Sequence, residues 1–321
     1  MGSEGNDNEV KMIPCLVFSE EIEEGSEEWR DMSRKVREAC ETHGCFVLVH
    51  NRTSLMRLQE EMLTAMKDLF DLPEETKMKH TSPKPYRSYH ANCPVIPLCQ
   101  SFGVDDAPHP FTAQAFTHLM WPHGNPSFCE TLRSMSEELL ELNLELMKMI
   151  VEGFDLPKHY VFDVERMKST SNFRMIKYKP PPSSSSGQDL ETGLIPHTDK
   201  CAITTLCQND VQGLQVLSKQ GQWIDVNVPR HGVVVVVGDI LKAWSNGRLH
   251  AVTHRVMMGG EKERYSFASF ALPEDEDEIE VPPELVDADH PLLYRPFTYG
   301  EYLDYYISSL LENALEVFAG V

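Results

Sequence analysis

The feature that most constrains the fold is a set of possible metal ligands that lie far apart in the chain. His197 and Asp199 are separated by one residue, and His254 lies 55 residues after Asp199. In an extended strand, side chains two positions apart point to the same side, so His197 and Asp199 can face one metal ion from a single strand. His254 can join them only if the intervening chain folds back. The spacing therefore predicts a β-rich fold in which distant strands lie side by side.

Two imidazoles and one carboxylate are the ligand set of non-haem iron(II) oxygenases, which leaves part of the coordination sphere open for substrates. The segment around His254, residues 249–256, is apolar and β-branched and predicts a further strand. A His-x-Asp pair alone is weak evidence, because a chain with 13 histidines can contain it by chance. The metal site therefore needs support from other residues.

Arg264 and Ser266 provide this support. They are two positions apart on an apparent strand, so they share a face with Ala268 and Phe270. An arginine beside a hydroxyl is a receptor for a carboxylate, and inside a barrel it would anchor a dicarboxylic acid whose other end reaches the metal. The alternative is a surface arginine on the edge of a sheet.

These motifs resemble those of the plant iron(II)- and 2-oxoglutarate-dependent dioxygenases, and the likeness extends over nearly the whole chain. It includes a helix, a glycine and a strand at residues 36–49, the metal-ligand region 196–216, the segment 237–256 and the C-terminal stretch 286–298. Residues 116–122 and 246–249 are similar to the glucosinolate side-chain-modifying and auxin-oxidising members. The family's fold is a double-stranded β-helix, or jelly roll, flanked by helices.

The resemblance implies a role for each matching residue. The implied iron(II) ligands are His197, Asp199 and His254. The distal carboxylate of 2-oxoglutarate would be bound by Arg264, Ser266 and Tyr178. Phe270, which also has the parity of an inward-facing residue, would line the substrate pocket together with Phe116. Two positions depart from the family pattern: Ile176 replaces a frequent asparagine near the cosubstrate, and His50-Asn51 reverses a common Asn-His order.

The implied reaction is oxidation of a small plant metabolite with release of succinate and carbon dioxide. Iron(II), 2-oxoglutarate and dioxygen would take part, with ascorbate in support. Hydroxylation, desaturation and cyclisation all remain open, as does the identity of the substrate. One alternative is an oxidase of the same superfamily that needs no 2-oxoglutarate. Another is a catalytically silent protein that binds small molecules.

The chain is expected to form a single domain over residues 1–321, mainly β with flanking helices. A helix and strand region covers 1–125, a long helix region 126–160, the jelly-roll core 170–275 and a C-terminal helix 298–318. Apolar periodicity predicts helices over 26–43, 54–70 and 129–153. Thr298 and Glu301 predict a capping box. The serine-rich stretch 180–187 can be either a surface loop or a flap over the metal.

The composition limits the partners and the compartment. A formal net charge of −21 disfavours nucleic acid and anionic membranes as partners. The eight cysteines form no zinc-type pairs and no signal peptide is apparent, so we expect reduced thiols in a cytoplasmic protein. A small-molecule substrate is the expected partner, and the enzyme is expected to be a monomer.

Overall fold

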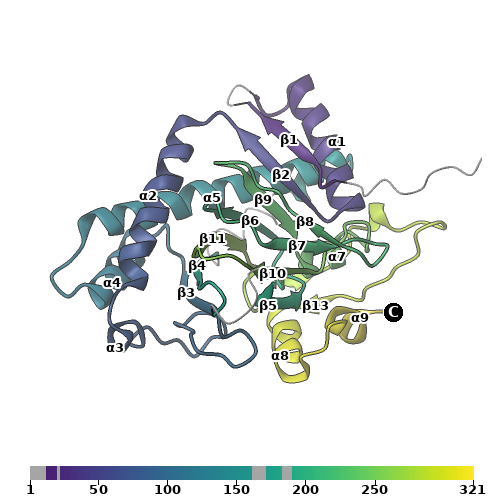
Figure 1. The fold of residues 1–321 in the computed structure, drawn as a ribbon. Helices are drawn as coiled ribbons and strands as arrows, with labels where there is room; N and C mark the ends of the chain where they lie inside the picture. Colours follow the sequence, from purple (N-terminus) through teal and green to yellow (C-terminus); the bar gives the residue numbers. More distant parts are fainter. Residues whose placement is uncertain (1–11, 20–21, 161–170, 183–189) are drawn as a thin grey trace, which may run out of the picture.

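The computed structural model describes residues 12–19, 22–160, 171–182 and 190–321, and two β-sheets form its centre (Figure 1). The major sheet has the strand order β1 (Cys15–Phe18), β2 (Cys45–His50), β9 (Val233–Val237), β6 (Ile203–Gln208), β11 (Arg264–Ala271), β4 (Asn172–Tyr178) and β3 (Cys99–Asp105). The minor sheet has the order β5 (Glu191–His197), β10 (His254–Met258), β7 (Leu214–Leu217) and β8 (Trp223–Asp225). A short pair, β12 (Glu278–Ile279) and β13 (Phe297–Thr298), lies outside both.

Helices flank the two sheets. They are α1 (Glu27–Thr42), α2 (Thr53–Phe70), α3 (Glu74–Lys77), α4 (Pro110–Met120), α5 (Pro126–Gly153), α7 (Asp239–Trp244), α8 (Tyr299–Ser309) and α9 (Ala314–Ala319). The long helix α5 passes behind the major sheet and packs against β6 and β11 (Figure 1). The α8 and α9 helices pack on each other, and α8 also contacts β13 (Figure 1). Mainly β structure with flanking helices is therefore confirmed.

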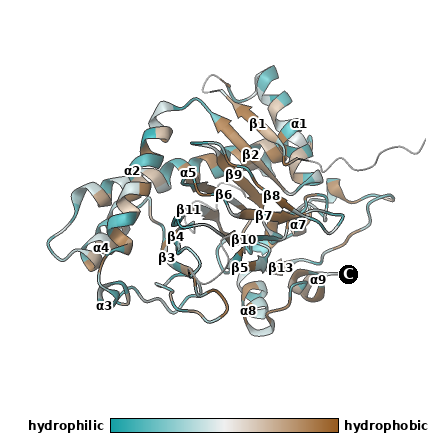
Figure 2. Ribbon diagram, viewed as in Figure 1, coloured by the Kyte–Doolittle hydropathy of each residue, from teal (hydrophilic) through white to brown (hydrophobic). Residues whose placement is uncertain are grey.

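The two faces of the major sheet have different partners. On β11, Tyr265 and Phe267 belong to the hydrophobic cluster that includes the helices. The alternate residues of the adjoining strands face the minor sheet, where Ile176 and Tyr178 pack with Val256. Strands such as β2 and β9 are mainly hydrophobic, whereas the helices are mixed (Figure 2). This pattern is expected when a sheet is covered on both sides.

The predicted helix over 26–43 is confirmed as α1. The Ser26 side chain accepts a hydrogen bond from the backbone nitrogen of Trp29 at 3.0 Å and caps its start. At its end, Gly44 has a φ of +70°, and its backbone nitrogen bonds the carbonyl of Ala39 at 3.2 Å. Glycine is suited to this left-handed position because it has no Cβ. The helices predicted over 54–70 and 129–153 correspond to α2 and α5.

The C-terminal helix differs from its prediction. Thr298 makes no side-chain capping bond to α8, because it is the last residue of β13 and its backbone pairs with Glu278. The helix ends at Ser309, where Leu310 adopts a left-handed φ of +52°, and a separate helix follows from Ala314. The predicted single helix to residue 318 is thus two helices. The helices α4 and α7 were not predicted.

Two further points concern the sequence expectations. Among the described residues, no helix combines the length and apolar character needed to cross a membrane. All eight cysteines are free of disulfide bonds. The residues 183–189 of the predicted loop or flap lie outside the described part of the chain.

Candidate metal centre

Three side chains from two strands and a loop form a group of possible metal ligands. His197 is the last residue of β5, His254 is the first residue of β10, and the two are directly paired across the ladder. Their ring centroids are 4.3 Å apart. The Nε2 atom of each lies 3.7 Å from Oδ1 of Asp199. These separations leave room for one ion at ligand distances of roughly 2 Å.

Backbone hydrogen bonds orient both imidazoles. Nδ1 of His197 lies 2.8 Å from the carbonyl oxygen of Ile195, and Nδ1 of His254 lies 3.2 Å from that of Val252. A carbonyl oxygen can only accept, so each Nδ1 carries the proton and each Nε2 keeps its lone pair. The atoms that face the common point are therefore the ones able to bind a metal.

The protonation states also fit a metal site. Burial, together with the neighbouring His254, lowers the pKa of His197 to about 4, so its ring is neutral at pH 7. Burial alone would raise the pKa of Asp199, but the two imidazoles and the hydroxyl of Thr204 outweigh it and lower that pKa. A neutral imidazole and an ionised carboxylate are the forms that bind metal.

The position of Asp199 is fixed by a loop and not by a strand. The expectation that His197 and Asp199 share one strand is wrong, because β5 ends at His197. The backbone nitrogen of Asp239 instead donates to the carbonyl of Asp199 at 2.8 Å. A Cβ added to Gly238 would lie 2.0 Å from the carbonyl oxygen of Cys201, so this close approach of two loops requires glycine. The strand expected over 249–256 likewise begins only at His254.

Thr204 completes the orientation of the carboxylate. It lies near the start of β6, and its Oγ1 donates to Oδ2 of Asp199 at 2.6 Å. The other carboxylate oxygen, Oδ1, is the one that faces the two imidazoles. Hydrogen-bonded partners of this kind fix the orientation of metal ligands.

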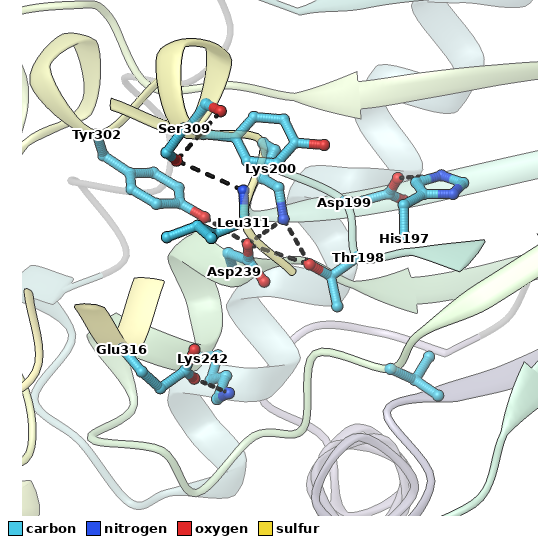
Figure 3. Close-up of polar contacts among 12 residues, drawn as sticks. His197, Thr198, Asp199, Lys200, Asp239, Lys242, Tyr302, Ser309, Leu311 and Glu316 are labelled. Atoms are coloured by element: carbon cyan, nitrogen blue, oxygen red, sulfur yellow. Dashed lines mark hydrogen bonds and ion pairs between the residues drawn. The ribbon is translucent and has the colours of Figure 1, made fainter. Parts of the chain in front are cut away.

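A buried polar network connects the same loop to the C-terminal helix α8 (Figure 3). Nζ of Lys200 bonds Oδ2 of Asp239 and Oγ1 of Thr198, both at 2.6 Å. The hydroxyl of Tyr302 donates to the same Asp239 oxygen at 2.5 Å. The ammonium of Lys200 also lies 4.4 Å from the ring centroid of Tyr306. Residues on either side of Asp199 are therefore held by α7 and α8.

Arg264 is fully buried and has no acidic partner among the described residues. It pairs with Tyr178 across β11 and β4, and its Cζ lies 5.1 Å from the centroid of that ring. Its Nη2 donates to Oε1 of Gln208 at 2.8 Å and its Nη1 to Oγ of Ser266 at 3.3 Å, while Nε has no partner. Burial lowers the pKa of Arg264, which Tyr178 opposes. A buried cation without a counter-charge is costly, and an anionic ligand would offset that cost.

The register places the possible cosubstrate and substrate residues on one face. Ser266 is opposite Gln208, and Phe270 is opposite Thr204, so their side chains all face the minor sheet. Phe270 is partly buried near the end of this face where Thr204 contacts Asp199. Its position is compatible with a pocket wall.

Phe116 lies elsewhere. It is buried in α4, with its ring centroid 5.7 Å from that of Phe102. Phe102 pairs with Met175 and faces the helices, which is the opposite side of the major sheet from Arg264. The structure therefore corrects the expected pocket role of Phe116: its burial reflects helix packing, and we do not retain it as a substrate residue.

Four residues of the site escaped the sequence analysis. Thr204 and Gln208 both lie on the inner face of β6, so a period of two counted from Thr204 could have found them. Lys200 directly follows Asp199, but its partner Asp239 lies 39 residues away and no local pattern links them.

Comparisons with known proteins agree with this geometry. The profile of the 2OG-Fe(II) oxygenase superfamily matches residues 169–273. The profile described as non-haem dioxygenase in morphine synthesis N-terminal matches residues 13–94. The probable 2-oxoglutarate-dependent dioxygenase AOP1.2 of Arabidopsis thaliana is 38% identical over 314 residues, which cover 96% of this chain and 95% of that protein.

Solved structures of relatives have the same fold. The dioxygenase for auxin oxidation of rice has a TM-score of 0.78 and 30% identity, with 96% of this chain and 99% of that chain covered. The Arabidopsis thaliana dioxygenase for auxin oxidation 1, in a binary complex with 2-oxoglutarate, has a TM-score of 0.76 and 29% identity, with 87% of this chain and 100% of that chain covered. The chain thus belongs to the family of iron(II)- and 2-oxoglutarate-dependent dioxygenases.

Proposed function

We propose that this enzyme oxidises a small plant metabolite at an iron(II) ion bound by His197, Asp199 and His254. In the proposed arrangement, Arg264, Ser266 and Tyr178 bind the distal carboxylate of 2-oxoglutarate. The observation that carries the proposal is the buried guanidinium of Arg264, which has no acidic partner in the described ranges. It lies on the same inner face as Thr204, the residue that orients Asp199. A dicarboxylic acid that reaches from Arg264 to the metal satisfies both features.

When bound, iron(II) would supply the activation of dioxygen, coupled to the conversion of 2-oxoglutarate to succinate and carbon dioxide. The protein residues orient the ligands: Thr204 and the carbonyls of Ile195 and Val252 fix the donor atoms. Phe270 would hold the organic substrate against the metal. Hydroxylation, desaturation and cyclisation differ only in where that substrate lies.

The relatives support the proposed substrate class. The rice and Arabidopsis structures are of dioxygenases that oxidise auxin, a small plant metabolite. A compound of similar size is the proposed substrate class here. The formal charge of −21 supports the absence of nucleic-acid and membrane partners. We further propose that the enzyme is a cytoplasmic monomer. The chain is proposed to form one domain, because one hydrophobic cluster contains residues from Phe18 to Ala319.

Succinate production and iron content test the proposal. Purified enzyme is supplied with iron(II), 2-oxoglutarate, oxygen and ascorbate, and screened against plant small molecules. His197→Ala and Asp199→Ala each remove one of three protein ligands, so stoichiometric iron binding and succinate formation should both be lost. The matched control is His290→Ala, which removes an exposed histidine paired with Asp287. Full turnover in either triad variant would exclude the assignment.

The same assay separates the alternatives. An oxidase that needs no 2-oxoglutarate would convert its substrate without producing succinate. A silent binding protein would bind small molecules without iron-dependent turnover.

A further inference from the structure

We propose that Arg174 is a second anion-binding residue of the active site and that it binds a carboxylate of the organic substrate. The inference rests on the proposed function and narrows its substrate class to small organic acids.

Arg174 lies on the inner face of the major sheet. It pairs with Ala268 across β4 and β11, and Ala268 shares its face with Arg264 and Ser266. On β4 it alternates with Ile176 and Tyr178, both of which pack between the two sheets. The neighbouring residues Phe173 and Met175 face the helices instead. The guanidinium therefore extends from the same face as the cosubstrate residues, further along the strand from Tyr178.

Within the described part of the chain, the charge of Arg174 has no carboxylate to balance it. No ion pair to an acidic side chain is present there, and its buried Nε has no hydrogen-bond partner among the same residues. The hydrogen bond that its side chain makes among these residues runs from Nη2 to Oγ of Ser101 at 3.1 Å. Nearby cations are treated differently: Lys177 pairs with Glu263 at 2.8 Å and Lys200 with Asp239 at 2.6 Å. The protein has a net charge of −21, so acidic side chains are plentiful. An arginine without an acidic partner in the described part of the chain is therefore a specific feature of this face.

The surroundings of Arg174 connect it to the metal side of the site. Its Cζ lies 5.5 Å from the centroid of the Tyr86 ring. The side chains of Tyr86 and Tyr306 are hydrogen-bonded. Tyr306 in turn packs over Lys200, the residue that follows Asp199. Arg174 and the metal-ligand loop therefore border the same aromatic group.

The backbone is shaped to bring Tyr86 to this position. Gly103 is the cross-strand partner of Arg174 on β3. A Cβ at Gly103 would lie 2.1 Å from the carbonyl oxygen of Tyr86, so the Tyr86 segment can lie against β3 only because residue 103 is glycine.

A carboxylate fits these observations. A guanidinium carries five N–H donors, and Arg174 uses few of them within the protein. Two parallel hydrogen bonds to a carboxylate would satisfy the free donors and balance one charge. The aromatic ring of Tyr86 and the partly buried Phe270 offer apolar contacts to the rest of an organic acid.

The experiment measures binding of phenylacetate, indole-3-acetate and a panel of aryl- and alkyl-substituted acetic acids, each beside its neutral amide. The enzyme is loaded with zinc(II) and N-oxalylglycine, an inert analogue of 2-oxoglutarate, so that added acids cannot occupy the Arg264 site. Isothermal titration is expected to show at least one acid binding at least tenfold more tightly than its amide. Arg174→Gln should remove this preference, and Arg174→Lys should retain part of it. Arg133→Gln, which removes a partly exposed arginine of α5 that pairs with Glu130, should leave it unchanged.

Three results would overturn the inference: no acid of the panel binds the wild-type enzyme, acids and amides bind equally, or Arg174→Gln keeps the preference. The comparison of acid with amide uses the wild-type protein alone, so it decides the matter even if a variant fails to fold. Failure of the proposed function would appear differently, as the absence of iron-dependent consumption of 2-oxoglutarate in the wild-type enzyme.

Discussion

Replacement of Arg264 should have opposite consequences for cosubstrate binding and for the stability of the ligand-free enzyme. Arg264 is completely buried, hydrogen-bonds Gln208, Ser266 and Tyr178, and leaves Nε without a partner among the described residues. Hydrogen bonds to a charged group contribute about 1.5–3 kcal/mol each. Arg264→Gln keeps one amide donor but loses the charged fork to the carboxylate, so we expect a loss of about 2–3 kcal/mol in 2-oxoglutarate binding. At 1.4 kcal/mol per factor of ten, this corresponds to a roughly 30- to 150-fold increase in the KM for 2-oxoglutarate.

The ligand-free protein should respond differently to the same change. A desolvated cation without a counter-charge opposes folding, so its removal should leave the free energy of unfolding within about 1 kcal/mol of the wild-type value or raise it. Ser266→Ala is the matched control: it removes one neutral hydroxyl, worth about 0.5–1.5 kcal/mol, so the KM should rise less than about tenfold.

Steady-state kinetics with varied 2-oxoglutarate and denaturant unfolding of the metal-free protein measure the two quantities. An unchanged KM for 2-oxoglutarate would refute the anchor role. A loss of several kcal/mol in unfolding free energy, with a KM change no larger than that of Ser266→Ala, would show that Arg264 is a structural residue.

Three further predictions concern neighbouring residues. Thr204→Val should weaken iron(II) binding by about 10- to 100-fold without loss of the fold, because Oδ2 of Asp199 loses its donor; equal iron affinity by equilibrium dialysis would contradict this. Asp239→Asn leaves the largely buried Lys200 without its counter-charge and should lower the free energy of unfolding by roughly 3 kcal/mol, measured as a fall in Tm of about 5 °C or more. Glu316→Gln removes the acidic partner of a more exposed ion pair between α7 and α9 and should lower it by less than about 1 kcal/mol. Phe270→Ala should reduce substrate-coupled turnover while iron binding and substrate-free succinate formation persist; a large fall in Tm with unchanged coupling would show instead that its ring is part of the core.

Local patterns in the sequence predicted the elements that depend on local physics. The apolar stripe of α1, its Ser26 cap and the glycine at its end were all visible, because helix periodicity and capping involve neighbouring residues. The alternation on β11 was also visible, so Arg264 and Ser266 were correctly assigned to one face. The ladder that pairs His197 with His254 was expected only in outline, since register depends on turns that no short pattern specifies.

The errors arose where tertiary contacts override a local rule. The Thr298 capping box is typical of a helix start, but backbone pairing with Glu278 competes for the same residue. Leu310 ends α8 in a left-handed conformation that leucine rarely adopts, and the local sequence does not predict this conformation. Phe116 has the character of a pocket residue in sequence, yet the face on which it lies is decided by how α4 packs on β3.

The distribution of satisfied and unsatisfied charges separates the structural from the functional part of this site. Oδ2 of Asp239 accepts hydrogen bonds from Lys200, Thr198 and Tyr302, so this buried carboxylate connects the metal-ligand loop to α8 (Figure 3). By contrast, Arg264 and Arg174 have no acidic partner among the described residues, although both lie on the inner face. A buried guanidinium without a counter-charge, such as that of Arg264, does not stabilise the fold. The ion pair between Lys200 and Asp239 shows that other cations near this site are paired within the protein. Two arginines on one wall, both without an acidic partner in the described ranges, fit the arrangement that we propose, in which 2-oxoglutarate and an acidic substrate bind together.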